Sequence, residues 1–205
     1  MQRLSGIRRF LAATLTCLLF GSASIADPLH RFSKEDAYWH HGSGWVFPRI
    51  VASFVLEGTP GQIDGNEDVT STYVMVSRDQ RRTATLDVYL PDSAAVGAKL
   101  STAKAAAEAR ANAGKCGVTS SEKRYVVGRQ PQIVGVEVSF IPGAGAGADC
   151  SRSTLYFFPT THWVITVRGM AAASDADAAA SLREFVEALR WDTLDTDPFL
   201  QSAQP

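Results

Sequence analysis

The stretch RTATLDVYL, residues 82–90, decides the fold of this chain. Apolar side chains occupy every second position, and threonines, an aspartate and a tyrosine fill the positions between them. A period of two is typical of a strand with one buried face, so we predict a β-strand here. The buried side holds Ala84, Leu86, Val88 and Leu90, and the opposite side holds Thr83, Thr85, Asp87 and Tyr89.

Other segments with the composition of strands lie on both sides of this stretch. Two precede it, at 45–56 and 72–76, and four follow it, at 124–127, 133–141, 154–158 and 163–168. Several of the connections have the length of hairpin turns, such as the polar loop 77–81. Hairpins join antiparallel neighbours, so we predict a mainly antiparallel sheet.

Two segments have the pattern of helices. The first begins after Pro91, where Asp92 or Ser93 can cap it, and ends before Gly114. Its apolar stripe consists mostly of alanine, which would let the helix lie close to a sheet: Val96, Leu100, Ala103, Ala107 and Ala111. The second runs over 174–190, with Ser174 and Asp177 as a capping pair. Its buried face is Leu182, Phe185, Val186 and Leu189, and we expect Trp191 to close over its end.

The order of these elements predicts one α+β domain over residues 45–192. It contains a mainly antiparallel sheet of about seven strands, with the two helices packed on one face. An extended lead segment at 27–44 precedes this domain, and a tail at 193–205 follows it.

Three parts of the chain resemble the PsbP family of photosystem II accessory proteins and its exported bacterial relatives. They are the stretch Trp45-Val46-Phe47-Pro48 at the first strand, the strand Ala84–Leu90 followed by Pro91, and the last helix, Ser174–Arg190. The resemblance is one of topology and implies the fold. It carries over no functional residue.

The first 26 residues have the pattern of a cleaved secretory signal. Arg3, Arg8 and Arg9 precede an apolar run at 10–20, and Ser24-Ile25-Ala26 supplies the small residues of a cleavage site. The apolar run is short for a bilayer span, which argues against an uncleaved anchor. Cys17 is not expected to carry a lipid, because Thr16 precedes it where lipoprotein signals have a smaller residue. A twin-arginine signal is not expected either, because the usual spacer between the arginine pair and Phe10-Leu11 is missing. We predict a periplasmic or secreted protein that begins at Asp27.

The charge and hydropathy of the remaining chain argue against a nucleic-acid partner and against a membrane-spanning segment. Removal of residues 1–26 would leave 17 basic against 21 acidic residues, a net charge of −4. No basic stripe is present, so we expect no nucleic-acid partner. No second apolar segment is long enough to cross a bilayer, so we expect no transmembrane segment in the mature chain.

Cys116 and Cys150 are the two cysteines that cleavage would leave. An even number of cysteines in an oxidising compartment is typical of disulfides. The alternative, a redox pair, has Cys-x-x-Cys spacing in most proteins, and this chain has none. We therefore predict one structural Cys116–Cys150 bridge.

An aromatic cluster at the end of the lead segment and the start of the domain is the candidate partner-binding site. Tyr38, Trp39 and Trp45 lie beside flexible glycines and two histidines. Large amphipathic aromatics dominate contacts at protein interfaces, and they also cover the edges of cores. We predict that these three residues contact a partner, either a protein or an envelope component, with core cover as the alternative.

No motif in the chain predicts a cofactor. The glycine-rich loop 143–148 is followed by a strand instead of the helix that a dinucleotide site requires. Asp64, Asn66 and Asp68 match the first half of a calcium loop. Because Val69 and Met75 replace the glycine and the glutamate of that loop, we predict a polar turn and expect no metal site.

Two hypotheses on function follow from this pattern. The favoured one is an exported, non-catalytic binding or accessory protein, because the chain has no recognisable catalytic motif. The alternative is a secreted hydrolase whose residues meet only in the fold. In that case His40, His41 or His162 would lie within hydrogen-bond reach of a hydroxyl and a carboxylate.

Overall fold

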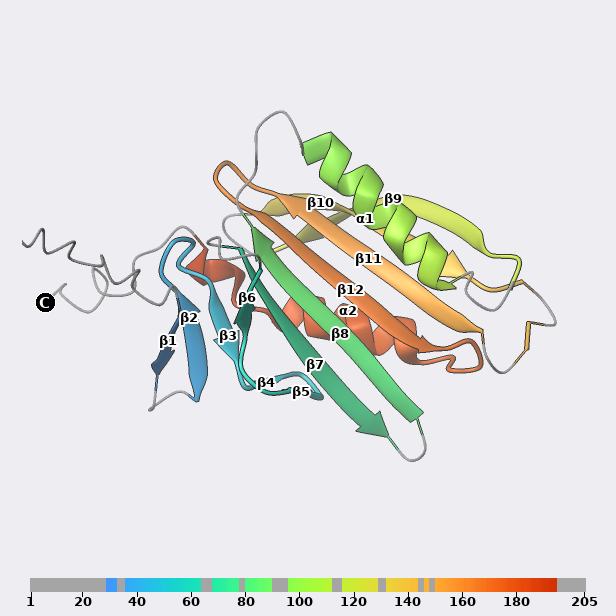
Figure 1. Cartoon of the computed structure of the whole chain (residues 1–205), viewed down its shortest axis with the longest axis horizontal. Coiled ribbons are helices and arrows are strands. Elements are labelled where there is room, and N and C mark those ends of the chain that lie inside the picture. The colour runs from blue at the N-terminus through green and yellow to red at the C-terminus, as the bar shows by residue number, and fades with distance from the viewer. Residues whose placement is uncertain are drawn as a thin grey trace, which may run out of the picture.

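A computed structural model describes the chain over residues 29–32, 36–63, 68–77, 80–89, 96–111, 116–128, 132–143, 146–147 and 150–194. Within these residues the chain forms two antiparallel sheets, two α-helices and one short 3-10 helix, η1 (Trp191–Thr193) (Figure 1). The α+β class with a mainly antiparallel sheet is confirmed. The predicted signal segment lies outside the described residues, as does the tail beyond Leu194.

The larger sheet has nine strands, in the spatial order β4-β5-β7-β8-β12-β11-β10-β9, with β6 paired to β7. The prediction of about seven strands was too low because short pieces before residue 63 also pair with β7. The strands are β4 (Ile50–Val51), β5 (Phe54–Leu56), β6 (Gly61–Gln62), β7 (Val69–Ser77), β8 (Gln80–Tyr89), β9 (Thr119–Val127), β10 (Ile133–Ile141), β11 (Ser151–Pro159) and β12 (Val164–Ala172).

The predicted lead segment forms most of a separate three-stranded sheet. Its strands are β1 (Leu29–Phe32), β2 (Ala37–His40) and β3 (Val46–Pro48), in sequential order. The Tyr73 hydroxyl on β7 donates a hydrogen bond of 2.9 Å to the Pro48 carbonyl and so ties this small sheet to the large one. Trp45 and Phe47 are fully buried in the main core.

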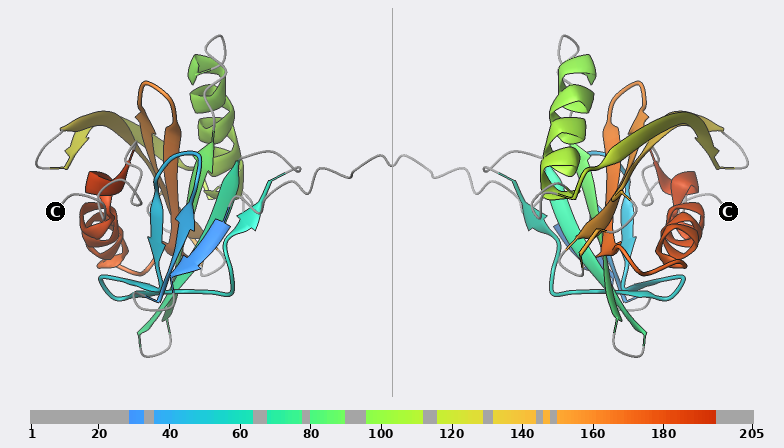
Figure 2. Two further views of the ribbon diagram at one scale, coloured as in Figure 1. Left: turned by 90° about the vertical axis from the view of Figure 1, so that its left-hand side faces the viewer. Right: turned by 90° about the vertical axis from the view of Figure 1, so that its right-hand side faces the viewer.

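The two helices lie on opposite faces of the large sheet, which corrects the prediction that both pack on one face (Figure 2). Helix α1 (Val96–Ala111) packs over β10 and β11, and α2 (Ala178–Ala188) packs on the other side. The physical reason lies in β11, where the side chains that point to either face of the sheet are buried. Leu155 belongs to the α1 side, whereas Tyr156 and Phe158 belong to the α2 side. A strand that is apolar on both faces requires cover on both.

The core on the α2 side is the larger one and is rich in aromatic rings. Phe185 of α2 packs edge to face against Phe54 and Tyr73, with ring centroids 5.1 and 4.9 Å apart. Leu182, Phe185, Val186 and Leu189 are all buried, as the sequence predicted. The Trp191 indole donates a 2.7 Å hydrogen bond to the Val186 carbonyl, so this residue does close the end of α2.

The core on the α1 side is small. Ala107 is buried, and Leu100 and Ala103 pack against a cluster that includes Val138, Phe140 and Leu155. The alanine stripe therefore brings α1 close to β10 and β11, as predicted. Helix α1 does not extend its apolar contact over β12, β8 and β7, which carry polar side chains at the middle of this face: Thr70, Thr72, Thr85, Asp87, Thr166 and Arg168.

Candidate functional site

The polar side of strand β8 forms the floor of the candidate site. Asp87 lies directly across from Thr70 of β7 and from Thr166 of β12. Because side chains two residues apart share a face, Asp68, Tyr89 and Arg168 project from the same side of the sheet. This side is also the one that α1 partly covers, since Leu155, opposite Arg168, belongs to the α1 cluster.

Asp87 is the centre of a hydrogen-bond network on this floor. Its Oδ1 accepts a 2.6 Å bond from the Thr70 hydroxyl. Its Oδ2 accepts a 3.0 Å bond from the Thr166 hydroxyl and a 2.9 Å bond from Arg168 Nη2. A carboxylate held by three donors from two neighbouring strands has a fixed orientation, so the floor is preorganised.

A hollow of about 400 Å³ lies between this floor and α1. We call it the polar groove, and it is lined by Asp68, Asp87, Tyr89, Thr102, Ala103, Ala106, Thr166 and Arg168. Its volume is within the range of small-molecule sites. The groove exists because α1 packs on β10 and β11 and presents short side chains, Thr102, Ala103 and Ala106, toward β8 and β12.

The described lining residues of the groove include two acidic side chains and one basic side chain. Asp68 and Asp87 supply two carboxylates, and Arg168 supplies one guanidinium. Tyr89 stays a neutral phenol, because burial and the nearby Asp87 raise its pKa well above the usual value. The described lining therefore offers carboxylate and hydroxyl acceptors, the guanidinium of Arg168 in an ion pair with Asp87, and the ring of Tyr89.

A second hollow, of about 340 Å³, lies near η1 and the turn after β11. Its lining includes Ile133, Pro159, Thr160 and Trp191 and has no charged side chain. The Thr160 hydroxyl is already engaged with Trp163, from whose amide it accepts a 3.0 Å bond. The polar groove, with its fixed carboxylate, is the better candidate for specific recognition.

The aromatic residues predicted to contact a partner lie elsewhere, and two of them are interior. Trp39 is 2% exposed and Trp45 is fully buried, so neither presents the surface anchor that the sequence suggested. Trp45 packs edge to face on Trp191, 5.1 Å between centroids. Tyr38 alone keeps partial exposure. The burial of Trp39 and Trp45 agrees with the alternative that these rings cover a core, while contact of the cluster with a partner stays a prediction.

Of the three candidate histidines, one is interior and two are exposed. His40 is fully buried, and its Nδ1 lies 2.7 Å from the Ser43 hydroxyl. That hydroxyl also accepts a 3.1 Å bond from the Trp45 amide, so the pair closes the turn between β2 and β3. His41 is exposed beside the ring of Trp39, and His162 is exposed in the turn after β11.

Only one of the three calcium-loop candidates falls on the described part of the chain. Asp68 lines the polar groove, whereas Asp64 and Asn66 lie outside the described residues. Across the residues that the structure describes, no group of three or more His, Cys, Asp or Glu side chains is arranged to hold a metal ion.

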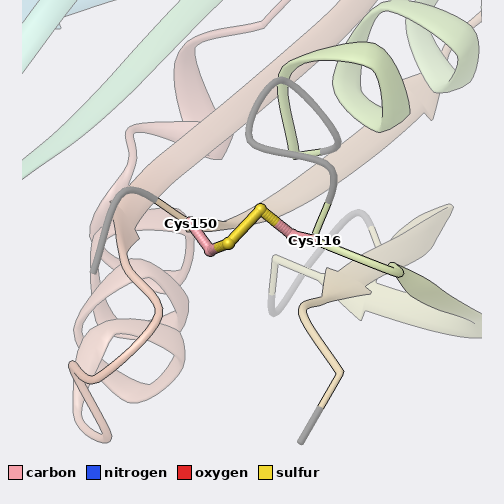
Figure 3. The surroundings of a disulfide bond; sticks show 2 residues. All are labelled: Cys116 and Cys150. Carbon is pink, nitrogen blue, oxygen red and sulfur yellow. A yellow bond between two sulfur atoms is a disulfide. The ribbon is translucent and has the colours of Figure 1, made fainter. Parts of the chain in front are cut away.

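The Cys116–Cys150 disulfide is confirmed, with Cα atoms 5.8 Å apart (Figure 3). It joins the segment after α1 to the start of β11, next to the opening of the hairpin that β9 and β10 form. A disulfide is compatible with an oxidising, extracytoplasmic location. In the described ranges neither helix has the length and apolar character needed to cross a membrane.

Comparison of the chain with protein-family models and with curated proteins finds no match. The resemblance to the PsbP family therefore stays a prediction.

Apart from Asp68, sequence reasoning missed the residues of the groove, although part of the signal was present. The alternation in 82–90 placed Asp87 and Tyr89 together on one side of a strand, which was interpreted as a solvent-facing side. Nothing in the local pattern links them to Arg168, which is 81 residues from Asp87 in the chain. Their meeting requires the pairing of β8 with β12, a long-range property of the sheet.

Proposed function

We propose that the protein is an exported, non-catalytic binding or accessory protein, and that the polar groove is its ligand site. The observation that carries the proposal is the network around Asp87, a half-covered floor of fixed polar groups beneath a helix with short side chains. Ligand sites are commonly preformed hollows with a few convergent polar groups.

The burial of the groove residues supports binding over a merely solvated sheet face. Asp87 is buried, and Thr166 is nearly inaccessible to water. Buried polar groups of this kind destabilise a fold unless they are paired, and they fix the orientation of whatever contacts them. The groove therefore combines a rigid floor with an opening that a small molecule can enter.

The alternative, a secreted hydrolase, has little support from the geometry. A hydrolase of this type needs a histidine that reaches both a nucleophile and solvent-borne substrate. His40 and Ser43 form a histidine–hydroxyl pair, and both side chains are fully buried. We therefore assign this pair to the turn between β2 and β3.

Export is part of the proposal. The support is the N-terminal pattern of arginines, apolar run and Ser24-Ile25-Ala26, together with a disulfide that suits an oxidising compartment. N-terminal sequencing of protein recovered from the periplasm or medium should give Asp27 as the first residue. Recovery of a chain that starts at Met1 would contradict this part of the proposal.

The binding function is tested by capture of small molecules. Immobilised protein is incubated with the small-molecule fraction of the source organism's periplasm or medium, washed, denatured and examined by mass spectrometry. We expect at least one compound that is retained by the wild type and lost with Ala106→Trp, which fills the groove. The matched control is Ala180→Trp, an exposed position on α2, which should retain the compound. Equal retention by all three proteins, or no retained compound, would contradict the proposal.

A further inference from the structure

We propose that the outer edge of β9 is the surface through which two copies of this chain associate. In this dimer β9 pairs antiparallel with β9 of the second copy, and the large sheet continues from one copy into the other across a twofold axis. The proposal does not depend on the polar groove, so its failure would leave the proposed function untouched.

β9 is a long strand with one open edge. It stands last in the order of the large sheet, next to β10 (Figure 1). Its register with β10 is continuous over all nine residues, from Thr119 opposite Ile141 to Val127 opposite Ile133. The side chains of residues 119–124 are exposed, and among the described residues no other strand pairs with this edge. A regular edge of this kind presents backbone N–H and C=O groups with which another strand can form hydrogen bonds.

The two faces of β9 limit the registers that a second copy can adopt. Glu122 and Arg124 project on the α1 side, because their partners on β10 belong to the α1 cluster or pack against it. Lys123 projects on the α2 side, since its partner on β10 stands opposite Tyr156 of the α2 core. In an antiparallel pair, residues that stand opposite each other project on the same face. Glu122 therefore cannot stand opposite Lys123 of the second copy.

The register that overlaps the whole strand also brings opposite charges together. Its twofold axis passes through Lys123, the middle residue of β9. Glu122 then stands opposite Arg124 of the second copy, and the axis creates this pair twice. An axis through Glu122 or through Arg124 would instead place that residue opposite its own copy. Opposite charges across a strand pair stabilise it, whereas like charges destabilise it.

Charged side chains on an edge strand can also prevent pairing, but those of β9 have complements in this register. Within the described residues Arg124 forms no ion pair, so a carboxylate of the second copy complements it. Glu122 pairs with Lys104 of α1 and keeps 48% of its side chain exposed. Lys123 Nζ lies 3.0 Å from Glu137 Oε1 on its own β10, which draws its charge away from Lys123 of the second copy.

The first test is the mass of the disulfide-bonded protein in solution. A contact between two strand edges buries little surface, so the dimer should be weak. Sedimentation equilibrium from about 10 µM to about 1 mM should show monomer and dimer in exchange. The dissociation constant should rise with added salt, because salt screens exposed charge pairs.

Charge reversal at the edge tests the register. Glu122→Arg and Arg124→Glu each place like charges opposite each other at both positions, which should raise the dissociation constant about tenfold. In an equimolar mixture of the two variants the charges at both positions are opposite again, so association should return. The matched control is Glu184→Arg, the same change of charge at an exposed position on α2, which should leave the dissociation constant unchanged.

Association that is weakened in each variant and restored in their mixture would support the proposal. A monomer at every concentration, or a dimer that neither variant weakens, would overturn it. Failure of the mixture to associate would also overturn it, once circular dichroism has shown that both variants are folded. A folding defect cannot imitate the restored association, because the mixture contains the same two proteins.

Discussion

Arg82 of β8 and Asp175, which precedes α2, form a buried bidentate ion pair across 93 positions of sequence. Arg82 Nε lies 2.5 Å from Asp175 Oδ2, and Nη2 lies 2.7 Å from Oδ1. Arg82 Nη1 also donates to the Ser181 hydroxyl on α2 at 2.5 Å. The pair therefore fixes the start of α2 against the strand whose opposite side forms the floor of the groove.

Removal of one partner of this pair should strongly destabilise the fold. Asp175→Asn leaves the Arg82 guanidinium buried without its counter-charge, and we expect a loss of about 3–5 kcal/mol in the free energy of unfolding. Urea unfolding followed by circular dichroism measures it. Glu184→Gln is the control, since Glu184 is an exposed carboxylate on α2. Equal destabilisation by both variants would show that the buried pair has no special role.

Because of this ion pair, the free energy of unfolding should fall as the pH drops into the acid range. Hydrogen bonds from Arg82 hold the pKa of Asp175 below its ordinary value. A depressed pKa in the folded state contributes stability above the unfolded pKa, about 4 for an aspartate, and this contribution is lost as the pH falls through the folded pKa. Unfolding free energies measured from pH 6 downward should fall less steeply below about pH 4 in Asp175→Asn than in the wild type. If the free energy of unfolding fell with pH by the same amount in both proteins, Asp175 would not be the cause of the loss in acid.

Reduction of the Cys116–Cys150 disulfide should lower stability without changing the fold. The bridge closes a loop with a sequence separation of 34, for which the chain-entropy account gives about 3–4 kcal/mol. The double variant Cys116→Ser, Cys150→Ser should show this loss in urea unfolding and retain its circular dichroism spectrum. Native protein in which both thiols react with an alkylating reagent would contradict the bridge itself.

Gly169 of β12 allows α2 to approach the sheet. A Cβ built on Gly169 would lie 2.2 Å from Leu182 Cδ2, so Gly169→Ala should cost about 1–3 kcal/mol through overpacking. Gly61→Ala is the control, since a Cβ there meets nothing within 4 Å. Adding Leu182→Ala to Gly169→Ala removes the clash, so the two substitutions together should destabilise by less than the sum of their separate effects. Strict additivity in thermal unfolding would argue against the contact.

The regular elements were predictable because their signals are local. The alternation in 82–90 gave β8, and the spacing of Leu182, Phe185 and Val186 gave the buried face of α2. β10 was predicted to the residue, at Ile133–Ile141. The disulfide followed from the even number of cysteines, the expected oxidising compartment and the lack of Cys-x-x-Cys spacing.

The placement of the helices and the groove was not predictable in the same way. Which face a helix covers depends on how strands far apart in sequence pair, and β12 lies beside β8 although a helix and three strands intervene. The apolar run 155–158 was the local sign of two covered faces, and the structure buries every residue from Ser153 to Phe158. Residue type alone could not decide between partner contact and core cover for Trp39 and Trp45, and the fold buries both.

The most direct test of the account is to map where a natural ligand contacts the protein. ¹⁵N-labelled protein is titrated with the small-molecule fraction of the source organism's periplasm or medium, and the amides whose shifts change are assigned. The account predicts changes at Asp87 and Tyr89 on β8, at Thr166 and Arg168 on β12, and at Thr102–Ala106 on α1. Changes confined to the hollow beside Trp191, or to Tyr38 and the small sheet, would contradict it.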